Sequence, residues 1–596
     1  MKTQKRPAST VGQSSSDTRN ETRAPSRFET RFKQRTETRT VNRSEVPAER
    51  QSDSRAEHRS ENRSENRSDN RPEGRVYSQP KNRIDSRSEN RSESRSEGRS
   101  VNRSGNRSEN RPLNRADSPA QATTQSRPAQ SIAARDPGIN QFTGQPRKPA
   151  LPPARAQKGA NNAPKKMYGD APTTIMGRRL IQVHMVLDEV LTWEFAADSV
   201  VSHWLRAHPE LGSRDRSEVA EAVFDVLRHL RKYRQLAEGG VGPATRRLAI
   251  QGLANTMGST RVLEEVSPPE KDWLLRILLV DPDTLPAAVK YSLPDWLYVR
   301  LHDLPDFDAL AQSLNTAAPL DIRVNPMKAD RDEVLADLHK GQAVRNDPTP
   351  TPYSPFGIRL QGRPALHKWH QFEHGLIEVQ DEGSQLLALL VGPKRGEMVI
   401  DFCAGAGGKT LLLGALMRST GRLYAFDVSS SRLAKAKPRF ARSGLSNVYP
   451  VVIEHENDTR VRRLAGKAHR VLVDAPCSGI GTLRRNPDLK WRQSEQSLAE
   501  LTQLQARILD RASQCVAPGG RLVYATCSIL EEENEGQVET FLAKHPDFEV
   551  VDAAHILAAR TPLMIEGPYL KLRPDVHETD GFFAVVFERK STSENT

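Results

Sequence analysis

Two cysteines in the last third of the chain have surroundings typical of reactive residues. Cys477 stands in the run Asp-Ala-Pro-Cys-Ser-Gly at 474–479, and Cys527 stands in Thr-Cys-Ser at 526–528. Each run follows a short apolar segment that is typical of a buried strand. Because ligands bind at the carboxyl ends of strands in open α/β sheets, we expect both thiols to face one pocket.

A thiolate in such a pocket can activate a pyrimidine ring. C5 of a pyrimidine is too weakly nucleophilic to take a methyl group directly, but a thiolate that adds to C6 makes C5 nucleophilic. Asp474 is the candidate carboxyl group for the charge change at N3, and a base must then remove the C5 proton so that the thiol can leave. The attack needs one cysteine, and the second is left to assist breakdown of the adduct.

A glycine-rich turn upstream of these cysteines predicts a cofactor site. An apolar strand at 397–402 runs directly into this turn, and an apolar helix follows at 411–417. Glycines in such a turn let the backbone approach a ligand closely. A Walker loop needs four residues between its first glycine and Gly-Lys-Thr, and Gly405-Ala406-Gly407 is too tight for that. The turn does not fit G-x-G-x-x-G either, because the sixth position is Thr410. The candidate cofactor-binding residues of the turn are Cys403, Ala404, Gly405, Ala406, Gly407, Gly408 and Lys409.

Three acidic residues follow three consecutive predicted strands. Asp427 ends the strand at 422–426 and is placed to accept hydrogen bonds from both ribose hydroxyls, an arrangement that serves NAD and S-adenosylmethionine alike. Asp458 follows a strand at 451–453 and is expected to reach the adenine edge, while Asp474 follows the strand at 470–473. We interpret Cys515, in a predicted helical run, as a buried small hydrophobic residue.

Composition separates a long tail from the folded part. Residues 1–170 hold 36 of the 88 Lys and Arg and 20 of the 75 Asp and Glu, so the remainder is near neutral. The tail contains a four-residue repeat, as in Arg59-Ser60-Glu61-Asn62, without apolar positions. It cannot bury a core, and we expect disorder over 1–172. The two interpretations of the tail are a salt-sensitive RNA tether and a merely solvating segment.

The rest of the chain predicts three further regions. Residues 173–314 carry a helical pattern, with Ser213 as an expected N-cap. Residues 315–380 predict a small α/β subdomain, and 381–590 alternate helices with short apolar strands, which indicates an α/β, doubly wound parallel sheet. We expect neither a signal peptide nor a transmembrane segment, and we expect a cytoplasmic monomer without a metal.

At these motifs the chain resembles the Sun/RsmB-type RNA 5-methylcytosine methyltransferases. The resemblance covers about residues 175–590 and includes Gln380–Gln385, the glycine-rich turn and both cysteine runs. It implies a Rossmann-like domain that binds S-adenosylmethionine through the 403–409 turn and the acids Asp427, Asp458 and Asp474. It also implies that Cys527 is the nucleophile, that Cys477 aids product release and that Lys409 belongs to the active site.

The resemblance further implies a NusB-like RNA-binding domain at 173–314, an RNA-binding role for 315–380 and 16S rRNA as the substrate. The basic segment 484–492, with its one tryptophan, suits a strand of RNA crossing the site. Leu530 replaces a proline that is usual in the family, and we expect this to affect a helix start at 531–534 rather than the chemistry.

Three alternatives stay open at this point. A tRNA methyltransferase would use the same mechanism. A non-catalytic RNA-binding or ribosome-assembly factor would have no need of the intact cysteine pair. An NAD-dependent oxidoreductase would leave both cysteines unexplained.

Overall fold

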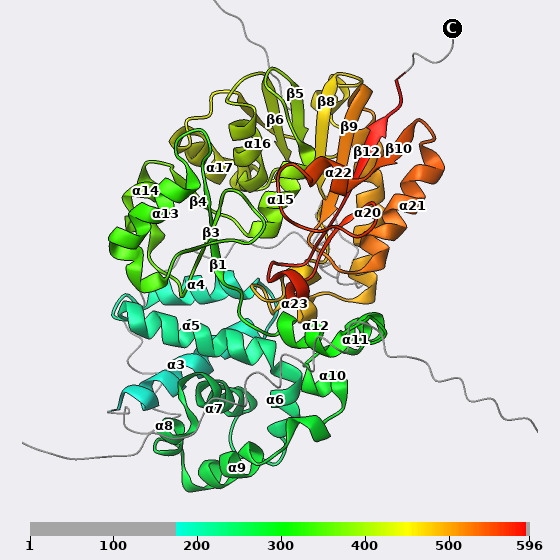
Figure 1. Ribbon diagram of the computed structural model, residues 1–596. Coiled ribbons are helices and arrows are strands. Elements are labelled where there is room, and N and C mark those ends of the chain that lie inside the picture. The colour runs from blue at the N-terminus through cyan, green and yellow to red at the C-terminus, as the bar shows by residue number, and fades with distance from the viewer. Residues whose placement is uncertain (1–173, 592–596) are drawn as a thin grey trace, which may run out of the picture. The chain divides into compact units, whose positions relative to one another are not determined.

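The computed structural model describes residues 174–591 (Figure 1). The tail predicted for residues 1–172 lies outside the described residues and stays a prediction. Within the described part, no helix is both long and apolar enough to cross a membrane.

The first described region consists of helices, as its sequence pattern predicted. The likeness of this region to NusB stays a prediction. Its elements are α3 (Ile175–Val190), α4 (Ala197–Ala207), α5 (Ser213–Arg228), α6 (Leu230–Leu236), α7 (Ala244–Met257), α8 (Ser259–Leu263), α9 (Pro268–Leu278), η1 (Pro282–Thr284), α10 (Ala287–Lys290), α11 (Asp295–Leu301) and α12 (Phe307–Leu314).

Helix α5 is central to this region because its apolar stripe is completely buried at Val219, Val223 and Leu227. Three- and four-residue spacing puts these side chains on one helical face, which packs against α3 and α7. The predicted N-cap was wrong by one residue: α5 begins at Ser213, and Gly212 is the N-cap residue. The Asp215 carboxylate accepts the Gly212 N–H at 3.0 Å, so the cap is closed by the third helical residue.

The second region is a small antiparallel sheet in the order β2-β3-β1-β4. Its buried core includes Ile322, Val324 and Ile358. The elements are β1 (Leu320–Val324), α13 (Arg331–Lys340), η2 (Gln342–Asn346), β2 (Thr349–Pro350), β3 (Gly357–Leu360), η3 (Leu366–Lys368), α14 (His370–Glu373) and β4 (Ile377–Val379).

The third region is an eight-stranded sheet in the order β10-β12-β9-β8-β5-β6-β7, with β11 paired to β12. Its strands are β5 (Met398–Asp401), β6 (Arg422–Asp427), β7 (Val448–Val452), β8 (Ala468–Asp474), β9 (Val516–Thr526), β10 (Phe548–Val551), β11 (Leu570–Leu572) and β12 (Phe582–Arg589). Its helical elements are α15 (Glu382–Val391), α16 (Gly408–Leu416), α17 (Ser430–Arg442), α18 (Thr459–Arg462), η4 (Ile480–Thr482), α19 (Leu489–Arg492), α20 (Glu495–Ser513), η5 (Glu531–Glu533), α21 (Glu535–Lys544), α22 (Ala553–Leu557) and α23 (Pro574–His577).

The two faces of the large sheet are covered by different helices (Figure 1). Side chains alternate along a strand, so Val471 and Val473 pack with α20 and α21, whereas Leu472 packs with α15 and α16. Val399 and Ile400 of β5 and Val471 to Val473 of β8 are apolar and completely buried, because helices cover both faces of the sheet. This two-sided burial explains the short apolar runs in the sequence.

One feature of the predicted sheet and the predicted placement of Cys515 were wrong. Strands β5 to β9 are parallel, as expected, but β12 pairs antiparallel with β9 and β10 pairs antiparallel with β12, so the sheet is mixed. Strand β12 pairs directly beside β9 and needs no crossover helix, a topology that strand patterns alone do not reveal. Cys515 is buried as expected, yet it lies just beyond α20 rather than inside it.

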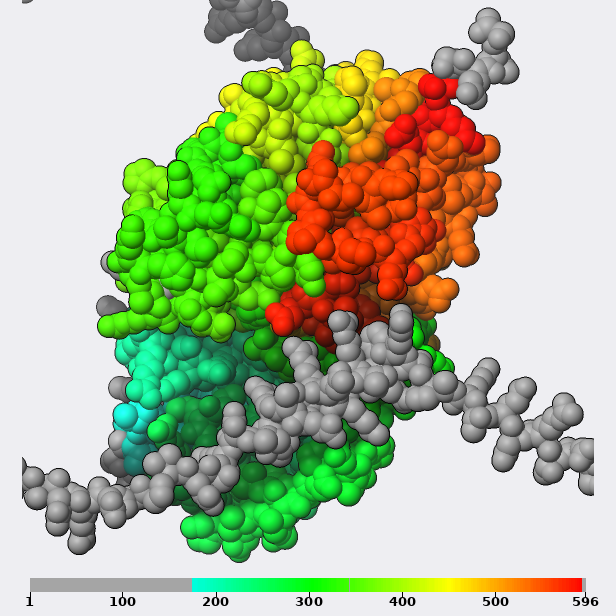
Figure 2. Space-filling model, in the orientation of Figure 1, coloured from blue at the N-terminus to red at the C-terminus, as the bar shows by residue number. Residues whose placement is uncertain are grey.

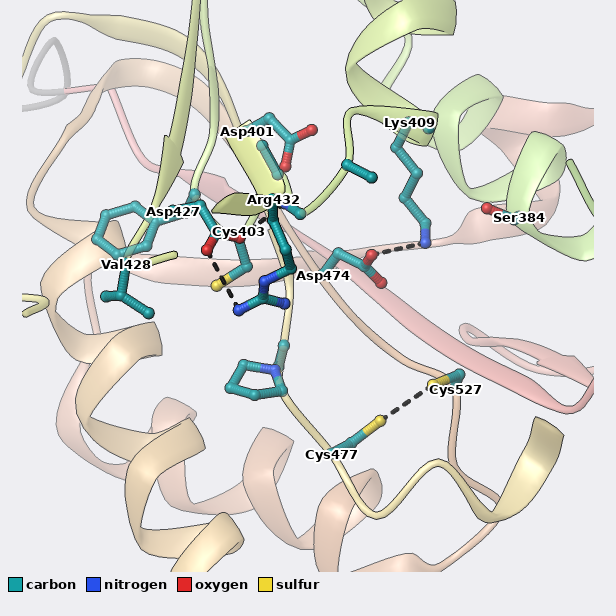
Figure 3. A pocket seen from close by; sticks show the side chains of 17 residues that line it. Ser384, Asp401, Cys403, Lys409, Asp427, Val428, Arg432, Asp474, Cys477 and Cys527 are labelled. Carbon is teal, nitrogen blue, oxygen red and sulfur yellow. Dashed lines mark hydrogen bonds and ion pairs between the residues drawn. The ribbon is translucent and has the colours of Figure 1, made fainter. Parts of the chain in front are cut away.

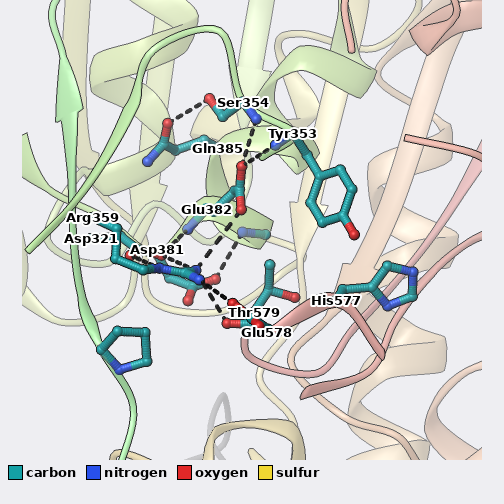
Figure 4. Close-up of polar contacts among 12 residues, drawn as sticks. Asp321, Tyr353, Ser354, Arg359, Asp381, Glu382, Gln385, His577, Glu578 and Thr579 are labelled. Carbon is teal, nitrogen blue, oxygen red and sulfur yellow. Dashed lines mark hydrogen bonds and ion pairs between the residues drawn. The ribbon is translucent and has the colours of Figure 1, made fainter. Parts of the chain in front are cut away.

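A polar cluster joins the small sheet to the region of the eight-stranded sheet, residues 382–589 (Figure 4). Arg359 of β3 donates to Asp321 of β1 at 2.8 Å and to Glu578 at 2.9 Å. Glu382, at the start of α15, accepts hydrogen bonds from the backbone N–H groups of Tyr353 and Ser354, each at 2.6 Å. In the space-filling view, the orange and red C-terminal residues accordingly lie against the green surface (Figure 2). These contacts fix α15 beside the site described next.

Candidate active site

A cavity of about 350 Å³ opens at the carboxyl ends of β5, β6, β8 and β9 (Figure 3). Ten of the residues predicted from the sequence line this cavity, and Gly407 and Asp458 are not among its described lining residues. The ten are Cys403, Ala404, Gly405, Ala406, Gly408, Lys409, Asp427, Asp474, Cys477 and Cys527.

The glycine-rich turn adopts a backbone that glycine favours. Gly405 and Gly407 have φ angles of 59° and 82°, both in the left-handed region. A Cβ atom on Gly407 would lie 2.6 Å from the Phe440 ring, whereas one on Gly405 would meet nothing within 4 Å. Gly407 therefore packs against the protein, whereas the space beside Gly405 is open to a ligand.

Asp427 is held rigidly at the end of β6. One carboxylate oxygen accepts the Gly405 N–H at 2.8 Å, and the other accepts the Ser429 N–H at 2.7 Å. Arg432, which also lines the cavity, lies 3.2 Å from the same carboxylate. A carboxylate oxygen has more than one lone pair, so Asp427 can still accept hydrogen bonds from a bound diol.

Asp401, at the end of β5, is a cavity-lining acid that the sequence analysis missed. One of its oxygens accepts from the Thr410 hydroxyl at 2.7 Å, and the other has no hydrogen-bond partner among the described residues. Burial raises the pKa of Asp401 to about 7, with the Asp474 carboxylate adding to the effect. Its position at the carboxyl end of a buried strand, like that of Asp427, was the signal that could have identified it.

Lys409 and Asp474 form an ion pair in the cavity, with 2.7 Å between the Lys409 Nζ atom and a carboxylate oxygen (Figure 3). Burial disfavours the Lys409 charge, but the adjacent Asp474 carboxylate and the Cys527 sulfur outweigh burial and raise the pKa of Lys409. The ammonium ion therefore persists at neutral pH and lies within electrostatic reach of Cys527.

The two cysteines come together in the lining of the cavity. Their Sγ atoms are 3.3 Å apart, and both thiols are free and partly buried. The hydrogen bond to Cys527, together with burial, raises the pKa of Cys477 well above its usual range. Cys477 therefore remains a thiol and can donate its proton to the sulfur of Cys527.

Asp458 lies away from these groups. It is the N-cap residue of α18, and its two oxygens accept from the backbone N–H groups of Arg460 and Glu454 at 2.8 and 3.0 Å. The Arg460 side chain pairs with the same carboxylate at 2.9 Å. A contact between Asp458 and an adenine edge stays a prediction.

We predicted that segment 484–492 contacts a strand of RNA. This was wrong for Lys490 and Trp491, whose polar groups bond to the protein itself. The Lys490 Nζ atom is buried and donates to the Arg228 carbonyl at 2.8 Å and to Asn315 at 2.7 Å. The Trp491 indole donates to the Leu227 carbonyl at 2.8 Å. A basic segment with one aromatic residue can bind RNA or can join two regions of a protein. Here Lys490 and Trp491 attach the end of α5 to the region of the large sheet.

The cavity has the chemistry that S-adenosylmethionine requires. Asp427 can accept from ribose hydroxyls, and the unpartnered oxygen of Asp401 suits a cationic ammonium group. The open side of Gly405 leaves space for close approach of a ligand to the backbone. The residues present therefore fit this cofactor.

Comparisons with known proteins agree with this arrangement. Residues 388–588 match the family model described as 16S rRNA methyltransferase RsmB/F, and residues 293–367 match an RsmF/B-like, ferredoxin-like domain. The second match begins before the subdomain boundary expected at residue 315.

The chain is also similar to curated proteins and to a solved structure. It is 30% identical to a probable ribosomal RNA small subunit methyltransferase B of a Synechocystis strain, over 67% of this chain and 96% of the relative. It is 33% identical to ribosomal RNA small subunit methyltransferase B of Salmonella paratyphi B, over 51% of this chain and 68% of that relative. The crystal structure of PH0851 superposes with a TM-score of 0.56 at 26% identity and covers 70% of this chain and 98% of that one.

Proposed function

The chain belongs to the RsmB/F family of 16S rRNA methyltransferases, and from this premise we propose that it methylates C5 of a cytosine in 16S rRNA through a covalent Cys527 adduct. The observation that carries this proposal is the 3.3 Å approach of the Cys477 and Cys527 sulfur atoms in the lining of the cofactor cavity. A cysteine that only fills space in a hydrophobic core would not need a second thiol within hydrogen-bond distance.

S-Adenosylmethionine is the cofactor, and when bound it supplies an electrophilic methyl group. The turn at 403–409 and Asp427 would hold it, with Asp401 as a further acidic contact at the cavity wall. The cavity also contains Asp474 and Lys409, so the residues that bind the cofactor adjoin those that face the target base.

The protein side chains would act in sequence on the cytosine ring. The Cys527 thiolate forms a bond to C6, and the Lys409 ammonium stabilises that thiolate before attack. The Asp474 carboxylate can accept a hydrogen bond from the amino group of the base, and the electron pair displaced by the sulfur makes C5 nucleophilic. After methyl transfer, a base removes the C5 proton, the ring electrons return and the bond between C6 and sulfur breaks.

The different contacts of the two sulfur atoms support their separate roles. Cys477 holds its proton because its pKa is raised by the hydrogen bond to Cys527 and by burial, so it is a poor nucleophile. Cys527 can accept a hydrogen bond from this thiol at 3.3 Å and lies within electrostatic reach of the Lys409 ammonium. Cys477 then assists release of the product.

The test is to incubate the full chain with labelled S-adenosylmethionine and separate rRNA and tRNA fractions, and then to map the methylated cytosines. We expect label at cytosine C5 in 16S rRNA. Transfer only to tRNA would reject the 16S substrate, and no transfer to either RNA would reject the enzymatic proposal.

A further inference from the structure

A buried pair of residues beyond the cofactor cavity contacts the loops that carry both cysteines. Glu533 ends η5, and Asn534 precedes α21. The sequence analysis assigned this segment only to the start of a helix. Glu533 is fully buried and Asn534 is 4% exposed, so their polar atoms depend on protein partners.

Glu533 fixes the loop around Cys477. One of its oxygens accepts the Ser478 N–H at 2.7 Å, and the other accepts the Ser478 hydroxyl at 2.5 Å. Gln505 donates to Glu533 and to the Pro476 carbonyl, each at 3.0 Å. Both chain neighbours of Cys477 are thus held by one hydrogen-bond network.

Asn534 fixes the loop around Cys527 in the same manner. Its side-chain oxygen accepts from the Thr526 hydroxyl at 2.6 Å, and its amide nitrogen donates to the Ser528 carbonyl at 3.2 Å. A single side chain therefore bonds to the residues on both sides of Cys527.

The two networks meet behind the sulfur atoms. The hydroxyl oxygens of Ser478 and Ser528 lie 3.3 Å apart, and the Tyr524 hydroxyl donates to the Glu533 carbonyl at 2.7 Å. Because these groups are buried, replacing one partner leaves the other unpaired, so these contacts restrict the loops strongly.

We propose that Glu533 and Asn534 are positioning residues with separate tasks. Asn534 holds Cys527 for attack on the base, and Glu533 holds Cys477 for release of the methylated product. This inference rests on the proposed function and adds the means by which each sulfur is aligned. Misplacement of a reacting group by about 1 Å can reduce a rate by roughly 100-fold, so the alignment matters for both steps.

The experiment follows a single turnover of the full chain with S-adenosylmethionine and unmodified 16S rRNA transcript, and it measures denaturation-stable protein–RNA adduct and methylated product. Glu533→Gln should form adduct at the normal rate but release product at least about tenfold more slowly, so that adduct accumulates. Asn534→Ala should form adduct at least about tenfold more slowly, without accumulation.

Smaller changes in the loops keep the test informative if either variant folds poorly. Ser478→Ala removes one Glu533 contact and should resemble Glu533→Gln, whereas Thr526→Val removes one Asn534 contact and should resemble Asn534→Ala. Glu531→Gln, at an exposed site in the same turn, is the matched control and should behave like the wild type.

Equal losses of adduct formation and product release in both sets of folded variants would overturn the inference, because a general loosening affects both steps alike. A wild-type chain that transfers no methyl group would instead reject the proposed function and this inference with it. Wild-type transfer combined with equal losses would reject only the separate tasks of Glu533 and Asn534.

Discussion

The sulfur atoms of Cys477 and Cys527 lie 3.3 Å apart although the residues are 50 positions apart in the chain. Neighbouring parallel strands bring them together, because β8 and β9 end at the same edge of the sheet. A direct backbone bond of 3.0 Å from the Gly481 N–H to the Cys527 carbonyl ties the two loops. The two sulfur atoms are not equivalent, since Cys477 retains its proton.

Lys409 should control the reactivity of Cys527. In Lys409→Met the ammonium beside Cys527 is lost, so the rate of methyl transfer should fall by about 100-fold. Single-turnover rates of methyl transfer test this, with exposed Lys435→Met as the control. A rate equal to that of the wild type would contradict the role of Lys409.

Asp401 should make stability depend on pH. Its pKa is about 7 in the folded chain, whereas an unfolded Asp ionises near pH 4, so the folded state binds the extra proton between these values. The contribution of Asp401 to the free energy of unfolding is therefore lost as pH rises from about 4 to about 7, and this contribution stays constant above that range.

Asp401→Asn lacks this titration and can keep an acceptor for Thr410. Relative to this variant, the wild type should lose up to roughly 4 kcal/mol in free energy of unfolding between about pH 4 and pH 7. Urea unfolding of both proteins at a series of pH values measures the difference. A difference that does not vary with pH would show that Asp401 is already ionised at acidic pH.

Gly481 should tolerate no side chain. A Cβ atom there would lie 2.2 Å from the Gly581 carbonyl oxygen and 2.9 Å from that of Cys527. Gly481→Ala must move one of the loops, and we expect a loss of about 1–3 kcal/mol in stability together with a loss of methyl transfer. Gly536→Ala is the control, since its Cβ would come no closer than 3.4 Å to Glu531. Equal free energies of unfolding for Gly481→Ala and Gly536→Ala would refute the claim that Gly481 tolerates no side chain.

Trp491 should couple the helical region to the catalytic region. Its ring packs against the helical core, and its indole donates to Leu227. Trp491→Ala should lower stability by about 2–4 kcal/mol and separate the thermal unfolding of the two regions into two transitions. Calorimetry compares this variant with Met564→Ala, which alters a residue that is 87% exposed. One unchanged cooperative transition would argue against such coupling.

Much of the catalytic region could be predicted because buried parallel strands leave short apolar runs. The residues after those runs, Asp427, Asp474 and Cys477, reach the cavity since strand ends share one edge of the sheet. Asp401 was missed because it was assigned to the strand interior, although it ends β5.

Contacts between distant segments could not be predicted in the same way. Lys490 and Trp491 have the composition of an RNA-binding stripe, yet their partners lie on or after helices far away in the sequence, at Arg228, Asn315 and Leu227. Glu533 likewise belongs to an acidic run that looks solvated, but it is buried by the cysteine loops. Sequence periodicity records burial of apolar faces and does not record which polar groups meet.

The most direct measurement of the central claim compares Cys477→Ala with Cys527→Ala for covalent adduct formation with 16S rRNA and S-adenosylmethionine. Cys477→Ala should accumulate an adduct that survives denaturing electrophoresis, because Cys527 can attack but release is impaired. Cys527→Ala should form none. An adduct with Cys527→Ala and none with Cys477→Ala would contradict the account and reverse the roles of the two sulfur atoms.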